Sequence, residues 1–503
     1  MTRSLLSTGF VLAALGATLV ACGDGGSGST GGNGGGTSTS TSTGGTTTTT
    51  PSGGTGGDTT TSSGGTGGNT MTGGTGGNTG GTGGNTGGTG GNTMTGGGGS
   101  GGVTMTTTTT PVEDEDGDGW KVSDGDCCDS AAAGCSVKPE LVNPGALEYP
   151  GDGVDNDCNP ATLDTDPYPT CSTKAIADQD IASQAVVSST KLVKAMDLCQ
   201  FTQEAPALPQ KTWGVISSKI TLADGTDAVA PKNIQMGVLP SFGPNVMPQY
   251  GETMAAISTG TARREGDPGY IHPQNGPMAG QQTGNYNAAT SCPAPPDYVA
   301  ANGGQVPSPC GNCMGANCVV AYDSVALRIR LRPPTNAKSF SYRFDFYSAE
   351  YPEFVCQDYN DYFVALLTGN PAPEIPADGN IAFDAQNNPV SVNNSFFDVC
   401  FPAVGSPPGS CSGGTLGLVG NGMGGWSGSI TDGGATGWLQ NDVPLELKQN
   451  PNDPNNMMNK IPTAAPIEIQ FTTWDSGDHN VDSLVLLDRF RWNLEPAVLL
   501  THQ

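Results

Sequence analysis

The chain has 503 residues, 77 of them glycine, and a formal net charge of −27 at pH 7. That charge argues against nucleic acid as a partner, because nucleic acid binding requires positive patches. The glycine content excludes a uniformly packed globule, and the 14 cysteines are typical of an oxidising compartment outside the cytoplasm.

Residues 1–21 have the layout of a secretory signal, with Arg3 followed by an apolar run. The stretch "LVAC" ending at Cys22 resembles the lipobox of bacterial lipoproteins, in which the cysteine is acylated and becomes the mature N-terminus. This resemblance implies a lipid-modified Cys22 and an exported protein, lipid-anchored to the outer membrane or the cell surface. The membrane is then a partner through the lipid. The alternatives are an ordinary cleaved signal and an uncleaved membrane helix, for which the apolar run is short.

Residues 22–112 follow as a segment of Gly, Thr, Ser and Asn with a tandem "GGTGGNT" unit. Such a composition cannot bury a core, so we predict a disordered tether. A Gly-rich coil of about 90 residues has a root-mean-square span of roughly 50 Å.

Residues 113–166 form a small acidic module with two clusters of carboxylates. In the first, aspartates alternate and are followed by Gly119, so that their oxygens can converge on a hard cation while glycine allows the turn. We predict calcium, because oxygen ligands favour it and the cysteines are expected to be oxidised. The alternative is a solvated acidic linker. The predicted ligands are Asp114, Asp116, Asp118, Asp124, Asp126, Asp129, Asp152, Asp155 and Asp157.

The beginning of this module resembles half of an EF-hand loop, but Gly125 stands where an EF-hand has its bidentate glutamate. The whole pattern, "DGDGW", "DGDCCD" and "NPGALEYPGDGVDNDC", is similar to the MopE-type metal-binding repeat of secreted bacterial proteins. We expect Cys127 or Cys128 to pair with Cys158 or Cys135, with the connectivity left open. Further disulfide candidates lie in and beside a long insert from about residue 266 to 317, which also holds Cys292: they are Cys310, Cys313 and Cys318.

Residues 172–495 have the composition of a large folded domain. A helical spacing of apolar residues predicts one helix near its start, within 180–199. Strands are predicted where apolar and polar residues alternate, over 323–333, 338–348 and 466–474. The fold class is therefore mainly β, a large antiparallel β-sandwich of jelly-roll type with one N-terminal helix.

Several stretches of this domain, "SFSYRFDFYSAEYPEFVCQDYNDYFVALLTG" and "FTTWDSGDHNVDSLVLLDRF" among them, resemble the choice-of-anchor L domain of bacterial surface proteins. The resemblance implies a surface location and a sandwich architecture, and it implies no activity. Two polar clusters in these stretches have two interpretations, a second calcium site or turn capping by local hydrogen bonds. Their members are Asp358, Asn360, Asp361, Asp475, Asp478 and Asp482.

The sequence as a whole favours a surface-anchored, non-enzymatic lipoprotein that binds calcium and displays its sandwich for adhesion or ligand binding. The ligand class is a glycan, matrix or protein. No GxSxG or HExxH motif is present, and the chain has three histidines. The alternatives are a purely structural surface protein and, with less support, a secreted glycan-active hydrolase.

Overall fold

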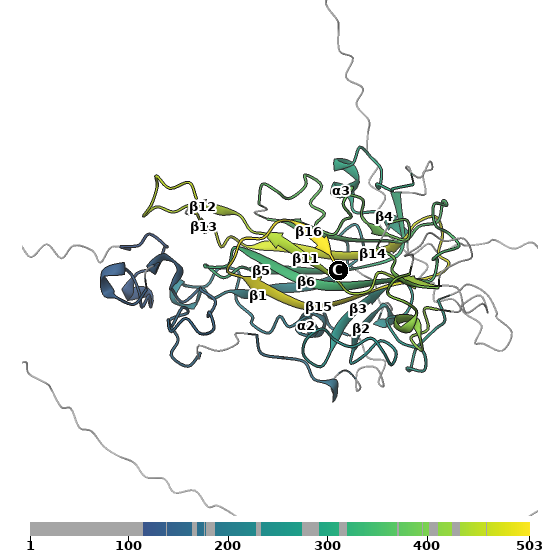
Figure 1. Cartoon of the computed structure of the whole chain (residues 1–503), viewed down its shortest axis with the longest axis horizontal. Helices are drawn as coiled ribbons and strands as arrows, with labels where there is room; N and C mark the ends of the chain where they lie inside the picture. The colour runs from purple at the N-terminus through teal and green to yellow at the C-terminus, as the bar shows by residue number, and fades with distance from the viewer. Residues whose placement is uncertain are drawn as a thin grey trace, which may run out of the picture. The chain divides into compact units, whose positions relative to one another are not determined.

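The structure is a computed structural model of the whole chain (Figure 1). It describes residues 114–136, 138–162, 168–175, 177, 187–227, 233–273, 291–310, 319–369, 372–394, 396–401, 411–424, 433–458 and 460–503. The predicted signal peptide, Cys22, the tether, Cys313 and Cys318 lie outside these residues. None of the helices described is long and apolar enough to cross a membrane.

Two antiparallel sheets make up most of the described structure (Figure 1). One has the strand order β1-β5-β14-β7-β8, with β4 paired to β5; the other has the order β16-β11-β6-β15-β3-β2, with β10 between β6 and β9. Strands β12 and β13 form a separate hairpin. The strands are β1 Gly214–Thr221, β2 Met236–Leu239, β3 Met254–Ser258, β4 Ser291–Pro293, β5 Val320–Arg332, β6 Ser339–Ser348, β7 Tyr362–Thr368, β8 Val390–Ser391, β9 Val399–Cys400, β10 Gly434–Ala435, β11 Leu439–Pro444, β12 Leu447–Gln449, β13 Lys460–Pro462, β14 Ile467–Asp475, β15 Ser483–Asn493 and β16 Leu500–His502.

The helical elements are short. They are the 3-10 helices η1 Val122–Asp124, η2 Ala131–Ala133, η3 Pro139–Leu141, η4 Leu208–Gln210, η5 Asn233–Gln235 and η7 Leu416–Leu418, and the α-helices α2 Ser189–Ala195 and α3 Pro296–Ala301. Helix α2 lies against β1, β2 and β3 (Figure 1).

The main core lies between the two sheets, as a sandwich requires. Tyr342 on β6 meets Phe471 on β14 with ring centroids 5.0 Å apart, and Phe344 meets Phe363 on β7 at the same distance. These contacts join one sheet to the other, so the prediction of an antiparallel β-sandwich is confirmed.

Strand β5 shows why alternation predicted the strands. Leu327, Ile329 and Leu331 are fully buried, while the arginines between them point to the other face. There Arg328 contacts Glu468 on β14, and Arg330 contacts Glu204 with Nη2 and Oε1 2.6 Å apart. Each glutamate supplies a charged hydrogen-bond acceptor for the guanidinium of its arginine on this half-exposed face.

Of the helix predicted within 180–199, the structure describes residues 187–199, where α2 begins at Ser189; residues 180–186 lie outside the described residues. Ser188 has extended backbone, and its side chain accepts a hydrogen bond from the backbone N–H of Lys191, so it caps α2 and starts the helix there. Leu192 and Met196 are buried as the pattern predicted. The serine cap sets the start of α2 through a local hydrogen bond that apolar periodicity does not register.

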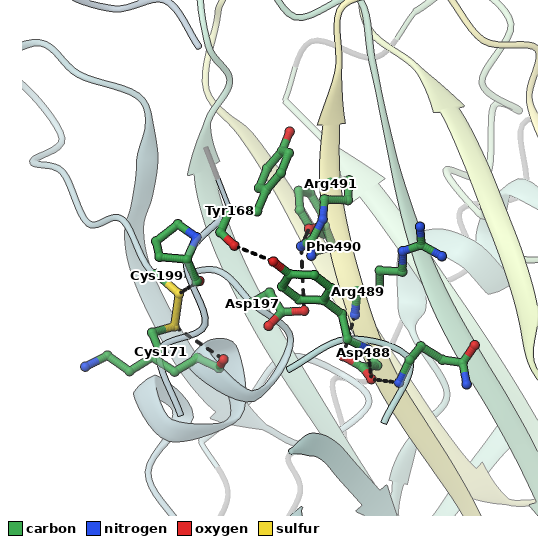
Figure 2. Close-up of polar contacts among 12 residues, drawn as sticks. Tyr168, Cys171, Asp197, Cys199, Asp488, Arg489, Phe490 and Arg491 are labelled. Carbon is green, nitrogen blue, oxygen red and sulfur yellow. Dashed lines mark hydrogen bonds and ion pairs between the residues drawn. A yellow bond between two sulfur atoms is a disulfide. The ribbon is translucent and has the colours of Figure 1, made fainter. Parts of the chain in front are cut away.

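An arginine on β15 attaches this N-terminal segment to the sandwich (Figure 2). The guanidinium of Arg491 lies 4.4 Å from the ring centroid of Tyr168 and 4.0 Å from that of Tyr250, and it pairs with Asp197 at 3.6 Å. Cation–π contacts of this kind stabilise by about 0.5–2 kcal/mol each. A disulfide between Cys171 and Cys199 closes the same segment.

Two further disulfides, Cys310–Cys356 and Cys400–Cys411, lie in the sandwich domain. The expectation of a disulfide near the long insert is met by Cys310, although its partner lies after β6. Cys292 from that insert is a buried thiol without a disulfide partner in the described part of the chain, and it contacts the hydroxyl of Ser324.

Candidate metal centre

The first acidic loop is shaped by its own aspartates. Backbone N–H groups of Gly117 and Gly119 donate to the two oxygens of Asp114, at 2.6 and 2.9 Å. The N–H groups of Asp118 and Trp120 donate to the aspartates two positions before them. Both glycines have positive φ, which an L-residue rarely adopts. Local turn bonds therefore hold both oxygens of Asp114 and one oxygen each of Asp116 and Asp118, and they fix the loop so that its carboxylates converge.

Carboxylates of this loop form two groups that share Asp116. In each group one oxygen from every member lies within 4.8 Å of the others, a spacing that suits a common metal ion. The groups are Asp114, Asp116 and Asp129, and Asp116, Asp118 and Asp126. The Oδ2 atoms of Asp116 and Asp126 are buried without a hydrogen-bond partner.

Burial and mutual repulsion act strongly on these carboxyls. Burial, with the neighbouring carboxylate of Asp118 next, raises the pKa of Asp116 to about 8. Burial likewise raises the pKa of Asp118 to about 7, although hydrogen bonds from the Trp120 amide and the Asn143 side chain oppose the shift. The charged forms are thus costly without a counter-charge, and a cation would supply one.

A third group comes from the second acidic cluster and comprises Glu148, Asp155 and Asp157. Glu148 is buried and accepts hydrogen bonds from the amides of Asn156 and Asp157. Sequence reasoning missed Glu148, which lies before the aspartate run in the "NPGALEYPGDG" stretch. The chain reverses direction between residues 148 and 157, and this reversal brings Glu148 next to Asp155 and Asp157. Its position inside the acidic repeat was the one feature of the sequence that could have identified it.

Seven of the nine predicted ligands fall in these groups, and Asp124 and Asp152 do not. Asp124 belongs to the 3-10 turn η1 and is a member of none of the groups. Asp152 is used for local turn bonds, with its oxygens accepting from the Val154 amide at 2.8 Å and from Asn156. Asp152 therefore acts as a turn former.

Two disulfides close the acidic module. Cys127 pairs with Cys158, and Cys128 pairs with Cys135. The first joins the loop that carries Asp126 to the segment that carries Asp157, so the two acidic clusters are held near each other. The sequence left the connectivity of these four cysteines open, and the structure has Cys127 bonded to Cys158 and Cys128 bonded to Cys135.

The acidic module is bonded to the sandwich domain. The side chain of Asn336 donates to the carbonyl of Leu147 at 2.8 Å and accepts from its N–H at 2.9 Å. The Asn143 side chain donates to Asp118 at 2.7 Å and accepts from the Thr335 hydroxyl at 2.7 Å. Asn143 therefore links Asp118, a candidate ligand, to Thr335 of the sandwich domain.

The second predicted cluster is divided by the structure. Asp361, Asp475 and Asp482 are buried at the ends of strands, and Asn360 is buried beside Asp361. Asp358 is exposed. Asp478 accepts hydrogen bonds from the backbone and side-chain amides of Asn480, at 2.8 and 3.0 Å, which is turn chemistry.

In the described part of the chain, three groups of carboxylates bring one oxygen of each member within 4.8 Å of the others, and all three lie in the acidic module. Their oxygen-only chemistry suits hard cations. Comparison with models of protein families, with curated proteins and with solved structures finds no match for this chain.

Proposed function

We propose that this protein is an exported, lipid-anchored surface protein that binds calcium in its acidic module and displays the β-sandwich for adhesion or ligand binding. The proposal includes the lipidated Cys22, the disordered tether and the two family resemblances. It is non-enzymatic, and its ligand is a glycan, a matrix component or a protein.

The observation that carries the calcium part is the pair of carboxylate groups sharing Asp116. Two of their oxygens, on Asp116 and Asp126, are buried without a hydrogen-bond partner, while the opposite oxygens hold the loop in place. Calcium takes six to eight oxygens at about 2.3–2.6 Å, and carboxylates, carbonyls and water complete such a shell. A solvated acidic linker would leave these oxygens exposed to water.

A groove of about 750 Å³ supports ligand binding over a purely structural role. Its lining includes Leu147 and Tyr149 from the acidic module and Tyr168 and Trp492 from the sandwich domain. The volume falls in the range of small-molecule sites, and aromatic side chains with a few polar neighbours are typical of them. Glu148, a member of the third carboxylate group, lies in the same lining.

Calorimetric titration of calcium into the chelator-stripped full chain, with disulfides intact, tests the proposal. We expect saturable binding, and we expect Asp116→Asn to remove it from the first loop. Asp124→Asn is the matched control, because Asp124 lies in the same loop but in none of the groups. A titration of Asp116→Asn that matches the unaltered protein in stoichiometry and affinity would refute the site.

Two further measurements test location and ligand. Mass spectrometry of the mature N-terminus should find an acylated Cys22, and an unmodified residue would remove the anchor from the proposal. Binding to a glycan array that disappears after chelation would support the binding role. Binding to nothing on glycan and matrix panels would leave the purely structural alternative.

A further inference from the structure

Two acidic side chains lie next to each other at one end of the first sheet. Asp361 immediately precedes β7, and Asp475 is the last residue of β14. Their strands pair antiparallel up to Tyr362 and Trp474, so the two aspartates occupy the next row of the ladder. Asp361 and Asp475 are 0% and 1% exposed.

The second sheet brings two more acids to the same end. Asp482 immediately precedes β15, and Glu350 follows β6 by two residues. Both are buried, with exposures of 1% and 2%. The Ser483 hydroxyl, on β15, donates to Asp361, which joins this end of the second sheet to the first.

These carboxylates have very few partners. Neither oxygen of Asp475 and neither oxygen of Asp482 has a hydrogen-bond partner, and one oxygen each of Asp361 and Glu350 also has none. The Thr259 hydroxyl, which donates to the Ser483 carbonyl at 3.4 Å, lies close enough to Asp475 to favour its charged form, and it carries no charge that could neutralise the group. Among the residues that the structure describes, no lysine, arginine or histidine forms an ion pair with any of the four.

Buried ionised carboxylates without compensation are strongly unfavourable, so something must neutralise this group. We propose that Asp361, Asp475 and Asp482 hold a calcium ion between the two sheets of the sandwich. Glu350 is the fourth side chain within reach of it. The site is separate from the acidic module and does not depend on it.

The flexibility of its coordination favours calcium over magnesium at this site. Unlike the groups in the acidic module, the oxygens of Asp361, Asp475 and Asp482 do not all lie within 4.8 Å of one another. Ligands on opposite sides of calcium are about 5 Å apart, twice its bond length, whereas magnesium holds them about 4 Å apart. Calcium also accepts irregular coordination, whereas magnesium requires near-ideal octahedral geometry, so calcium is the ion expected here.

A glycine makes room for one of the proposed ligands. A Cβ atom placed on Gly260 would lie 1.9 Å from Oδ2 of Asp482. The carboxylate therefore packs directly against the backbone at this point. Gly260→Ala would displace the Asp482 oxygens without changing any charge.

Protonation is the competing way to neutralise the group. Burial first, and then the neighbouring carboxylates, raise the pKa of both Asp475 and Asp482 well above the usual range. Asp323 is one of these neighbours, and its own carboxylate contacts Nδ1 of His479 at 3.1 Å. A protonated aspartate closely resembles asparagine, so substitution by asparagine separates the two explanations.

The test counts calcium ions bound per full chain, by elemental analysis after gel filtration in calcium, with disulfides intact. We expect Asp475→Asn with Asp482→Asn to lose one ion per chain relative to the unaltered protein. Asp345→Asn is the matched control, a single buried aspartate of β6 that should keep the full count. An unchanged count in the double variant would overturn the proposal in favour of shared protons.

Two other variants keep the test decisive. If the double variant does not fold, Gly260→Ala should lose the same ion, and a full count there would overturn the proposal. Asp116→Asn should remove binding from the first acidic loop and leave the ion of the sandwich in place. If that module binds nothing, the unaltered chain should still carry the one ion that the double variant loses, so the two proposals fail separately.

Discussion

Asp345 on β6 provides a direct test of how burial governs stability in this sandwich. Its side chain is 2% exposed and accepts hydrogen bonds from the Tyr347 hydroxyl at 2.9 Å and the Thr436 hydroxyl at 3.3 Å. Burial raises its pKa from 3.8 to about 7, and these hydrogen bonds oppose the shift only in part. The perturbation is Asp345→Asn, which keeps the shape and removes the titration.

The sign of the effect follows from linkage. The folded pKa is higher than the unfolded one, so the folded state keeps its proton at pH values where the unfolded chain has lost it. Stability from this group is therefore greatest below pH 4 and is lost as pH rises through about 7. With these two pKa values the loss between pH 5 and pH 8 is roughly 2.5 kcal/mol.

The assay is urea unfolding of the full chain at pH 5 and pH 8, followed by tryptophan fluorescence, with chelator present throughout. Other buried acids, such as Asp488, contribute equally to both proteins. The quantity compared is therefore the change in the free energy of unfolding between pH 5 and pH 8, in the variant and in the unaltered protein. We expect the variant to lose about 2.5 kcal/mol less than the unaltered protein over this interval. An identical loss in both would refute the assignment of this pH dependence to Asp345.

Two further predictions concern the acidic module. Replacing Cys127 and Cys158 with alanine opens a loop of sequence separation 31, which should lower the free energy of unfolding by about 3–4 kcal/mol through loop entropy. The module should then become protease-sensitive and bind calcium more weakly. An unchanged rate of digestion would contradict this prediction. Asn336→Ala leaves the N–H and the carbonyl of Leu147 without their hydrogen-bond partner, which should destabilise the protein by about 1–3 kcal/mol for each group. Hydrogen exchange at the Leu147 amide should therefore rise, while the calcium stoichiometry stays unchanged.

The sequence predicted strands well because their pattern is local. Alternation in β5, β6 and β14 depends on adjacent residues only, and those strands lie within a few residues of where the pattern placed them. The start of α2 was not predictable in the same way, because the cap at Ser188 is a local hydrogen bond that apolar periodicity does not register.

For the candidate sites too, ligands close together in the chain could be predicted, and ligands brought together by the fold could not. The aspartates of the first loop are close in the chain, so their convergence could be anticipated from spacing and glycines. Glu148 and Glu350 were missed because chain reversal and strand pairing bring them to their partners. Asp152 and Asp478 were included because turn formers and cation ligands are the same residue types.

The bond from Asn143 to both Asp118 and Thr335 has a mechanical consequence. If residues 22–112 tether the protein to a membrane, a pull on the tether reaches the acidic module first and passes to the sandwich through such side chains. Calcium bound at Asp118 would then stiffen the first link in the path of load. Under stretching at a surface, the ambient calcium concentration would set the force at which the module yields, well before the sandwich unravels.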